Sequence, residues 1–291
     1  MIGIVCHDAG AAEIISSWIS KNKNQYIYFL KGPALKIFKR KLKVVRIHTL
    51  SEVIAASDWI LCGTGWQSDI EKKAIQLAKN NRKKVVSYLD HWVNYGNRFK
   101  GPDGCISLPD EIWVGDKYAL DIANSIFKDT VIKLVENQYF EDVKIKFKNR
   151  KTVKNKSTIR ILYVCEPIIK HGEESNLKAQ GYDEKDALVF FLRNTSKITR
   201  GQPYLISVRP HPSESCEKYS WVQKIDPNIN VNKINNLVDD IENSDIVVGC
   251  ETMAMVIAIL SGRKVFSSIP PGNFKCNLPY NEIIYIRDIS Q

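Results

Sequence analysis

SDWILCGTGWQSDIEKKAIQLAKNNRKKVVSYLD at residues 57–90 and NSDIVVGCETMAMVIAILSGRKVFSSIPP at residues 243–271 follow one plan. Each contains Ser-Asp near its start, then a short apolar run, a glycine turn, a helical stretch, a basic pair and a second apolar run. Short continuous apolar runs around a helix are typical of a parallel sheet covered by helices on both faces. The pattern therefore predicts two βαβ units, with strands at 58–62, 84–89, 245–249 and 264–267.

Each half of the chain also opens on an apolar run, MIGIVC at 1–6 and TIRILYVC at 158–165. The lysine-rich stretch between the halves shows no apolar periodicity. We therefore predict an α/β protein with two Rossmann-like, doubly wound, parallel-sheet domains and a cleft between them. The expected N-terminal domain covers 1–145, the basic linker 146–157 and the C-terminal domain 158–291.

The charge balance favours an anionic partner, because 42 Lys and Arg residues face 32 Asp and Glu residues, for a net charge of +10. The excess is concentrated in 31–43 and 143–156. Neither segment has the interleaved aromatic residues of a base-stacking surface, so we do not expect nucleic acid as a partner. Each segment is either a solvated face or linker, or a peripheral contact with an anionic membrane surface.

Two further features bear on the cellular compartment. The chain has no apolar run long enough to span a bilayer, and its first residues lead directly into a strand without a basic, signal-like region. We therefore expect a cytoplasmic protein. The seven cysteines are scattered without a CxxC pair, which predicts buried thiols and not disulfides or zinc ligands.

The first half carries polar candidates after two strands, where open α/β sheets bind ligands. Asp8 precedes a helix expected from about residue 11, and we predict it as an N-cap or a general base. This turn lacks GxGxxG, so the dinucleotide fingerprint is missing. Asp90 follows strand 84–89 and is placed to take a proton from an acceptor hydroxyl.

The neighbours of these carboxylates are the expected acceptor side. We assign His7, His91 and Trp92 to it. Trp92, Tyr95 and Phe99 form either a wall for sugar rings or ordinary packing.

The second half brings three polar elements to successive strand ends. Arg209 and His211 lie in RPHPSES (209–215) after strand 204–208, Glu251 and Thr252 open the next helix, and Ser267 and Ser268 end strand 264–267. A histidine donor, a helix N-terminus and two hydroxyls predict a phosphate cradle. Glu251 is predicted to accept hydrogen bonds from ribose hydroxyls.

This combination of an HP dipeptide, a helix-opening Glu and a Ser pair resembles the donor site of bacterial sialyltransferases. It is similar also to related capsule or lipooligosaccharide transferases of GT-B fold, which use CMP-activated nonulosonic acids or similar keto-sugars. The resemblance implies that His211 contacts the CMP phosphate, Glu251 the ribose, and Ser267 and Ser268 the phosphate. The family's base lies in a D/E-D/E-G motif, where this chain has Leu-Asp90-His91-Trp, so the base is either Asp90 or Asp8.

The expected activity is an inverting, metal-independent glycosyl transfer to a glycan or lipid-linked acceptor in bacterial surface polysaccharide synthesis, with no cofactor. No DxD-like pair ends a strand, since Asp239 and Asp240 lie in a predicted helix, and His7, His48 and His171 lack metal-ligand spacing. One alternative is a GT-B transferase that uses UDP or another NDP-sugar, or a sugar-nucleotide 2-epimerase. Another is a non-catalytic sugar-nucleotide-binding protein.

Overall fold

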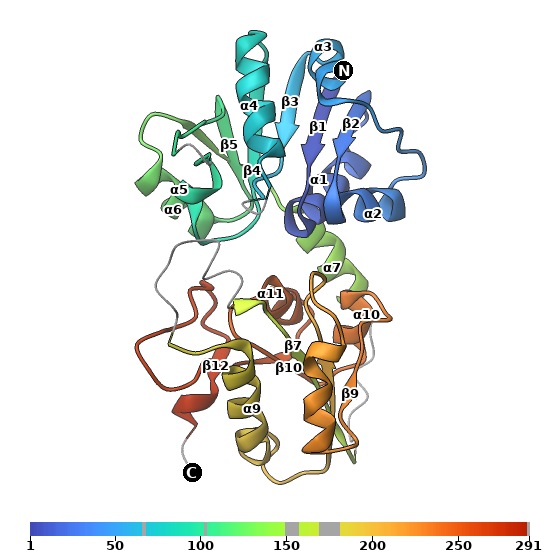
Figure 1. Cartoon of the computed structure of the whole chain (residues 1–291), viewed down its shortest axis with the longest axis vertical. Coiled ribbons are helices and arrows are strands. Elements are labelled where there is room, and N and C mark those ends of the chain that lie inside the picture. The colour runs from blue at the N-terminus through green and yellow to red at the C-terminus, as the bar shows by residue number, and fades with distance from the viewer. Residues whose placement is uncertain (66–67, 102–103, 149–156, 169–180, 290–291) are drawn as a thin grey trace. The chain divides into compact units, whose positions relative to one another are not determined.

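The computed structural model describes residues 1–65, 68–101, 104–148, 157–168 and 181–289. The chain divides into two compact units, Met1–Asp142 (unit 1) and Val143–Gln291 (unit 2). Each unit contains a six-stranded sheet whose strands all pair in parallel, flanked by helices (Figure 1). The predicted two-domain α/β fold is confirmed.

Unit 1 has the strand order β2-β1-β3-β4-β5-β6. Its strands are β1 (Ile2–Cys6), β2 (Tyr26–Leu30), β3 (Trp59–Cys62), β4 (Lys84–Leu89), β5 (Glu111–Val114) and β6 (Val131–Leu134). Its helices are α1 (Ala9–Lys21), α2 (Gly32–Lys41), α3 (Leu50–Ala56), α4 (Ile70–Asn80), α5 (Tyr95–Arg98) and α6 (Lys117–Ile126), and α7 (Gln138–Lys148) contains the division between the units. At the edge of the sheet, an isolated parallel bridge joins Tyr28 of β2 to Ile47.

Unit 2 has the strand order β12-β11-β10-β7-β8-β9. Its strands are β7 (Ile159–Val164), β8 (Tyr204–Arg209), β9 (Asn230–Val231), β10 (Ile246–Gly249), β11 (Lys264–Ser267) and β12 (Ile283–Tyr285). The helices in its described residues are α9 (Glu184–Thr199), α10 (Leu237–Glu242) and α11 (Met253–Leu260), with 3₁₀ turns η1 (Glu217–Lys224) and η2 (Ile286–Asp288).

The repeated stretches occupy equivalent places in the two sheets. β1 lies between β2 and β3, and β7 lies between β8 and β10, so each sheet is built outward from its first strand. The repeated frames are β3-α4-β4 and β10-α11-β11, next to that first strand in each unit. Gly262, at φ +70°, follows α11 in the left-handed conformation that glycine adopts without strain.

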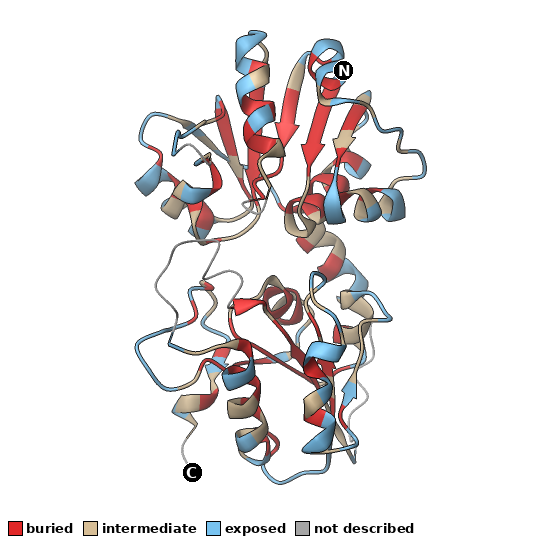
Figure 2. Cartoon of the chain, viewed as in Figure 1, coloured by how far each residue is buried: buried red, intermediate tan, exposed pale blue. Residues whose placement is uncertain are grey.

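The inner strands form the cores. Every residue of β1 and β10 is buried, and red strands mark the centre of each sheet in Figure 2. Cys6, Cys62, Cys165, Cys250 and Cys276 are free thiols that are buried as expected, Cys216 is half-buried, and Cys105 is exposed.

The predicted linker lies only partly in the described chain. Lys146 to Lys148 belong to the last turn of α7, and 149–156 lie outside the described residues. The exact domain limits and the cleft stay predictions. Within the described residues, none of the helices has the length and apolar character needed to cross a bilayer.

Candidate functional site

Asp8 lies at the carboxyl end of β1 and begins α1. Its Oδ1 accepts the backbone N–H of Ala11 at 3.3 Å, so the predicted N-cap is present. Burial raises the pKa of the Asp8 carboxyl well above its usual range, and the charges of Asp90 and Glu71 raise it further against the opposing effect of Arg98. This carboxyl therefore holds a proton more readily than an ordinary aspartate does.

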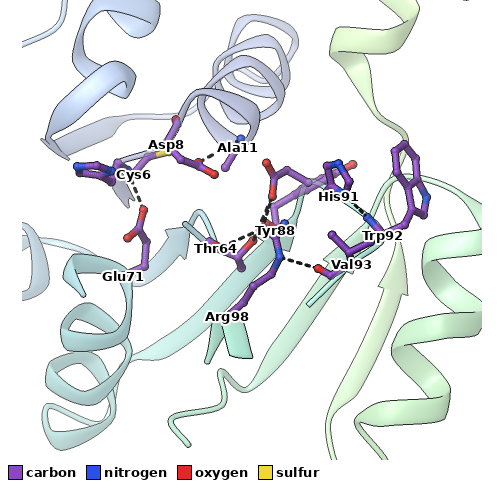
Figure 3. A network of polar contacts seen from close by, with 12 residues as sticks. Cys6, Asp8, Ala11, Thr64, Glu71, Tyr88, His91, Trp92, Val93 and Arg98 are labelled. Carbon is purple, nitrogen blue, oxygen red and sulfur yellow. Dashed lines mark hydrogen bonds and ion pairs between the residues drawn. The ribbon is translucent and has the colours of Figure 1, made fainter. Parts of the chain in front are cut away.

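Asp90, at the carboxyl end of β4, is held by an ion pair. Its Oδ1 lies 2.7 Å from Nη1 of Arg98, and the two side chains are 8% and 5% exposed. Arg98 also donates to the carbonyl oxygens of Thr64 (3.0 Å) and Val93 (3.2 Å), and Figure 3 shows its guanidinium directed toward Thr64. The guanidinium thus fixes Asp90 against two loops of unit 1.

Gly10 shows how closely the two carboxylates are placed. A Cβ atom at Gly10 would lie 2.0 Å from Oδ2 of Asp90. The second oxygen of Asp90 therefore rests against the first turn of α1, which Asp8 caps. The structure brings together the two residues between which the sequence left the choice of base open.

Glu71 is a third carboxyl group in this cluster, and sequence reasoning missed it. It lies in the first turn of α4, is only 2% exposed, and its Oε1 accepts the backbone N–H of His7 at 2.7 Å. Its Oε2 is buried without a hydrogen-bond partner. Burial raises the pKa of Glu71 to about 7, so the group is partly protonated at neutral pH.

The predicted acceptor-side residues have mainly internal contacts. The ring of His7 packs against Gly32, where an added Cβ would lie 2.6 Å from Nε2, and burial lowers the pKa of His7. His91 accepts the backbone N–H of Trp92 through Nδ1 at 3.0 Å. The indole N–H of Trp92 donates to Asp116 at 2.9 Å.

The predicted aromatic wall needs correction. Trp92, Tyr95 and Phe99 are 5%, 2% and 1% exposed, so all three rings belong to the interior of unit 1. Tyr95 stacks on Phe127 with ring centroids 6.4 Å apart, and Phe99 meets Phe127 edge to face at 5.4 Å. Ordinary packing, the alternative for these rings, is what the structure shows.

In unit 2, Glu166 is bonded to the turn that leads into α11, which begins at Met253 after the N-cap residue Thr252. It follows β7, and its Oε1 accepts the backbone N–H groups of Cys250 at 3.1 Å and Glu251 at 2.7 Å. Burial is the main cause that raises the pKa of Glu166 to about 7, and the charge of Glu251 adds to the effect. The helix end at which we predicted a phosphate thus already holds a carboxylate of the chain itself.

The other predicted donor residues around α11 also have partners within unit 2. Glu251 accepts hydrogen bonds from the backbone and side-chain amides of Asn277 at 2.8 and 2.9 Å, and Thr252 caps α11. Ser267 and Ser268 are fully buried and donate to the carbonyl oxygens of Cys250 (3.1 Å) and Gly249 (3.2 Å). A phosphate contact of these hydroxyls would require them to exchange those bonds, and it stays a prediction.

Arg209 and His211 are fixed by nearby side chains. Arg209 pairs with Asp240 on α10 and donates to the carbonyl oxygen of Asn235 at 3.0 Å, whereas the neighbouring Asp239 pairs with Lys146. The backbone N–H of Ser213 donates to Nδ1 of His211 at 3.2 Å. This contact leaves the proton of a neutral imidazole on Nε2, the tautomer able to donate to a phosphate oxygen.

Comparisons with known proteins identify the fold. No family model matches the sequence, and no curated protein matches it significantly. Among solved structures, UDP-GlcNAc 2-epimerase from Neisseria meningitidis, bound to UDP-GlcNAc, has a TM-score of 0.60 at 12% identity over 91% of this chain and 82% of that chain. The chain has a GT-B-like fold.

Two further structures agree with this GT-B-like fold. UDP-GlcNAc 2-epimerase from Methanocaldococcus jannaschii has a TM-score of 0.56 at 11% identity, over 91% of this chain and 83% of that chain. A putative UDP-N-acetylglucosamine 2-epimerase from Listeria monocytogenes has the same score at 12% identity, over 91% and 78%. At these identities the likeness concerns the fold, so the function must be argued from the site.

Within the described part of the chain, no group of three or more His, Cys, Asp or Glu side chains is arranged to hold a metal ion.

Proposed function

We propose that this GT-B-like chain is a glycosyltransferase that transfers a keto-sugar acid from a CMP-activated donor, with inversion and without a metal. The expected acceptor is a hydroxyl of a glycan or lipid-linked glycan in bacterial surface polysaccharide synthesis. The observation that carries the enzymatic part is that Asp8 and Asp90 lie close together in different electrostatic surroundings. Arg98 forms an ion pair with one carboxylate, Asp90, whereas burial and nearby carboxylates raise the pKa of the other, Asp8, and so make it a stronger proton acceptor than an ordinary aspartate.

Asp8 is the base in this proposal, and Asp90 is a fixed charge that tunes it. The acceptor hydroxyl loses its proton to Asp8 while its oxygen attacks the anomeric carbon. The bond between that carbon and the CMP phosphate oxygen breaks, and the electron pair leaves with CMP. Asp90 is the less suitable base because its Oδ1 is engaged by Arg98 and its Oδ2 rests against Gly10.

The proposed donor site in unit 2 rests on two arguments. Its motifs resemble the donor site of bacterial sialyltransferases, and Nδ1 of His211 accepts a hydrogen bond from the backbone. The tautomer with the proton on Nε2 suits a donor to the leaving phosphate. Glu251 keeps its proposed contact with ribose, in exchange for its bonds to Asn277.

Thermal unfolding with nucleotides tests this half. We expect CMP without magnesium to raise the melting temperature, because a ligand at 100 times its Kd adds about 2.7 kcal/mol to the stability of the folded state. His211→Ala should lose most of this shift, and the matched control His48→Ala, in unit 1, should keep it.

Each other result has a defined meaning. A shift with UDP or another diphosphate but not with CMP would replace the CMP donor by the NDP-sugar or 2-epimerase alternative. No shift with any nucleotide would remove the nucleotide site from unit 2. Binding without turnover that Asp8→Asn and Asp90→Asn both leave unchanged would support a non-catalytic binding protein.

We also propose that α2 and the segment after it contact anionic lipid, where a lipid-linked acceptor would be found. Lys36, Lys39, Lys43 and Arg46 are exposed, and Val44 between them is 82% exposed. Cations interleaved with an exposed apolar side chain suit a headgroup layer, and each cation near such a surface contributes about 1 kcal/mol.

Vesicle sedimentation tests this surface. The protein should sediment with phosphatidylcholine vesicles that contain phosphatidylglycerol, and not with pure phosphatidylcholine. The variant K36E/K39E/K43E should lose at least tenfold in binding, whereas K224E/K264E/K275E, which reverses three exposed lysines of unit 2, should lose little. Equal losses in the two variants would show that only net charge matters and would contradict a dedicated surface.

A further inference from the structure

Glu166 occupies backbone N–H groups in the turn that leads into α11, a place that would otherwise attract a ligand's phosphate. The free N–H groups and positive dipole end of a helix bind anions. In the turn just before α11, the backbone N–H groups of Cys250 and Glu251 are bonded to Glu166, and the N–H of the N-cap residue Thr252 also stabilises its charge. A phosphate that arrived at these donors would have to replace the carboxylate.

The sheet order places this carboxylate next to the proposed nucleotide contact. β7, which ends just before Glu166, lies between β10 and β8. The backbone N–H of Cys165 donates to the carbonyl oxygen of Arg209 at 2.9 Å, which joins the residue before Glu166 to the strand that leads to His211. Glu166 thus comes from the central strand, with the start of α11 on one side and the His211 loop on the other.

We propose that Glu166 is a specificity-determining residue that restricts the site to nucleotides with a single phosphate. The inference rests on the proposed nucleotide site of unit 2. In the proposed function, His211 is the donor to the single phosphate of CMP. The second phosphate of a diphosphate needs a further anion position, and the one at α11 is filled by a group of the same charge.

The surroundings of Glu166 predict how this restriction depends on pH. Glu251 is the other carboxyl group that faces it, and Tyr163, Cys165, Tyr182, Cys250 and Cys276 are the other titratable groups coupled to its charge. The pKa values of these tyrosines and cysteines are all raised, so these groups are neutral at pH 7. Because the pKa of Glu166 is about 7, its negative charge, and with it the exclusion of diphosphates, should increase from pH 6 to pH 8.

Calorimetric titration with CMP, CDP and inorganic phosphate tests the inference in the wild type, Glu166→Gln and a control. The control is Glu217→Gln, an exposed glutamate on η1 of the same unit. At pH 8 the wild type and the control should bind CMP at least tenfold more tightly than CDP. Glu166→Gln should bind CDP and inorganic phosphate about tenfold more tightly than the wild type does, with CMP affinity within about threefold. At pH 6 the ratio of the wild-type affinities for CMP and CDP should be smaller than at pH 8.

The outcomes separate this inference from the proposed function. Equal wild-type affinities for CDP and CMP at pH 8, or an unchanged ratio in Glu166→Gln, would overturn the role of Glu166 even if nucleotides bind. If no nucleotide binds either protein, the nucleotide site fails, and the gain of inorganic phosphate binding in Glu166→Gln decides whether Glu166 fills an anion site. The wild-type pH series needs no substitution, so it decides the question if Glu166→Gln does not fold.

Discussion

Asp8→Asn should lower the rate of sugar transfer by about 10²- to 10⁴-fold, the usual contribution of a general base, and leave nucleotide affinity unchanged. An asparagine still accepts the N–H of Ala11 and still caps α1, so the variant removes the proton acceptor and keeps the helix start. CMP release from a CMP-activated nonulosonic acid, measured with a panel of glycan acceptors, gives the rate.

The pH dependence provides the control for this assignment. The rate should fall as the pH falls through the raised pKa of Asp8, at a higher pH than for an ordinary aspartate. Asp90→Asn should move this fall to lower pH, because removing the Asp90 charge removes one of the causes of the raised pKa. If Asp8→Asn stays active, and the rate of Asp90→Asn no longer falls as the pH is lowered, the base is Asp90.

Arg98→Ala should cost about 3–5 kcal/mol of unfolding free energy, because it leaves the carboxylate of Asp90 buried without its ion partner. Urea unfolding followed by tryptophan fluorescence reports on unit 1, where Trp18, Trp59 and Trp113 cluster. Arg46→Ala, an exposed arginine of the same unit, should stay within about 0.5 kcal/mol of the wild type.

A double-variant cycle checks the physical reason. Asp90→Ala together with Arg98→Ala should be clearly less destabilising than the sum of the two single changes, since the second change removes the uncompensated charge. Additive losses, or a loss below about 1 kcal/mol for Arg98→Ala, would show that the pair is not an effective buried ion pair.

The fold could be predicted from the sequence because its signals are local. The frames at 57–90 and 243–271 combine short apolar strands with a helical period, and these patterns do not depend on distant contacts. The positions of Asp8 and Asp90 followed from the rule that parallel strands present their carboxyl ends at one edge. Asp8 and Asp90 are therefore close in space because β1 and β4 belong to the same sheet.

The missed residues act through contacts that no local pattern reveals. Glu71 meets the backbone of His7, and Glu166 meets that of Cys250 and Glu251, in each case from a distant part of the sequence. One signal was present, since Glu166 follows its strand at the same offset as Asp8 follows β1. The burial of Trp92, Tyr95 and Phe99 was not predictable, because the local sequence around an aromatic residue in a loop is the same whether its ring packs inward or faces a ligand.

The single bridge between Tyr28 and Ile47 has a consequence for aggregation. Beyond this bridge, β2 is the last strand on its side of the sheet, and such an edge offers unpaired backbone groups to another chain. Lys43 and Arg46, exposed just before the bridge, place like charges along the edge of every copy. The same cations proposed to contact lipid thus act as gatekeepers against strand-to-strand association, so neutralising them should make the protein more prone to self-associate.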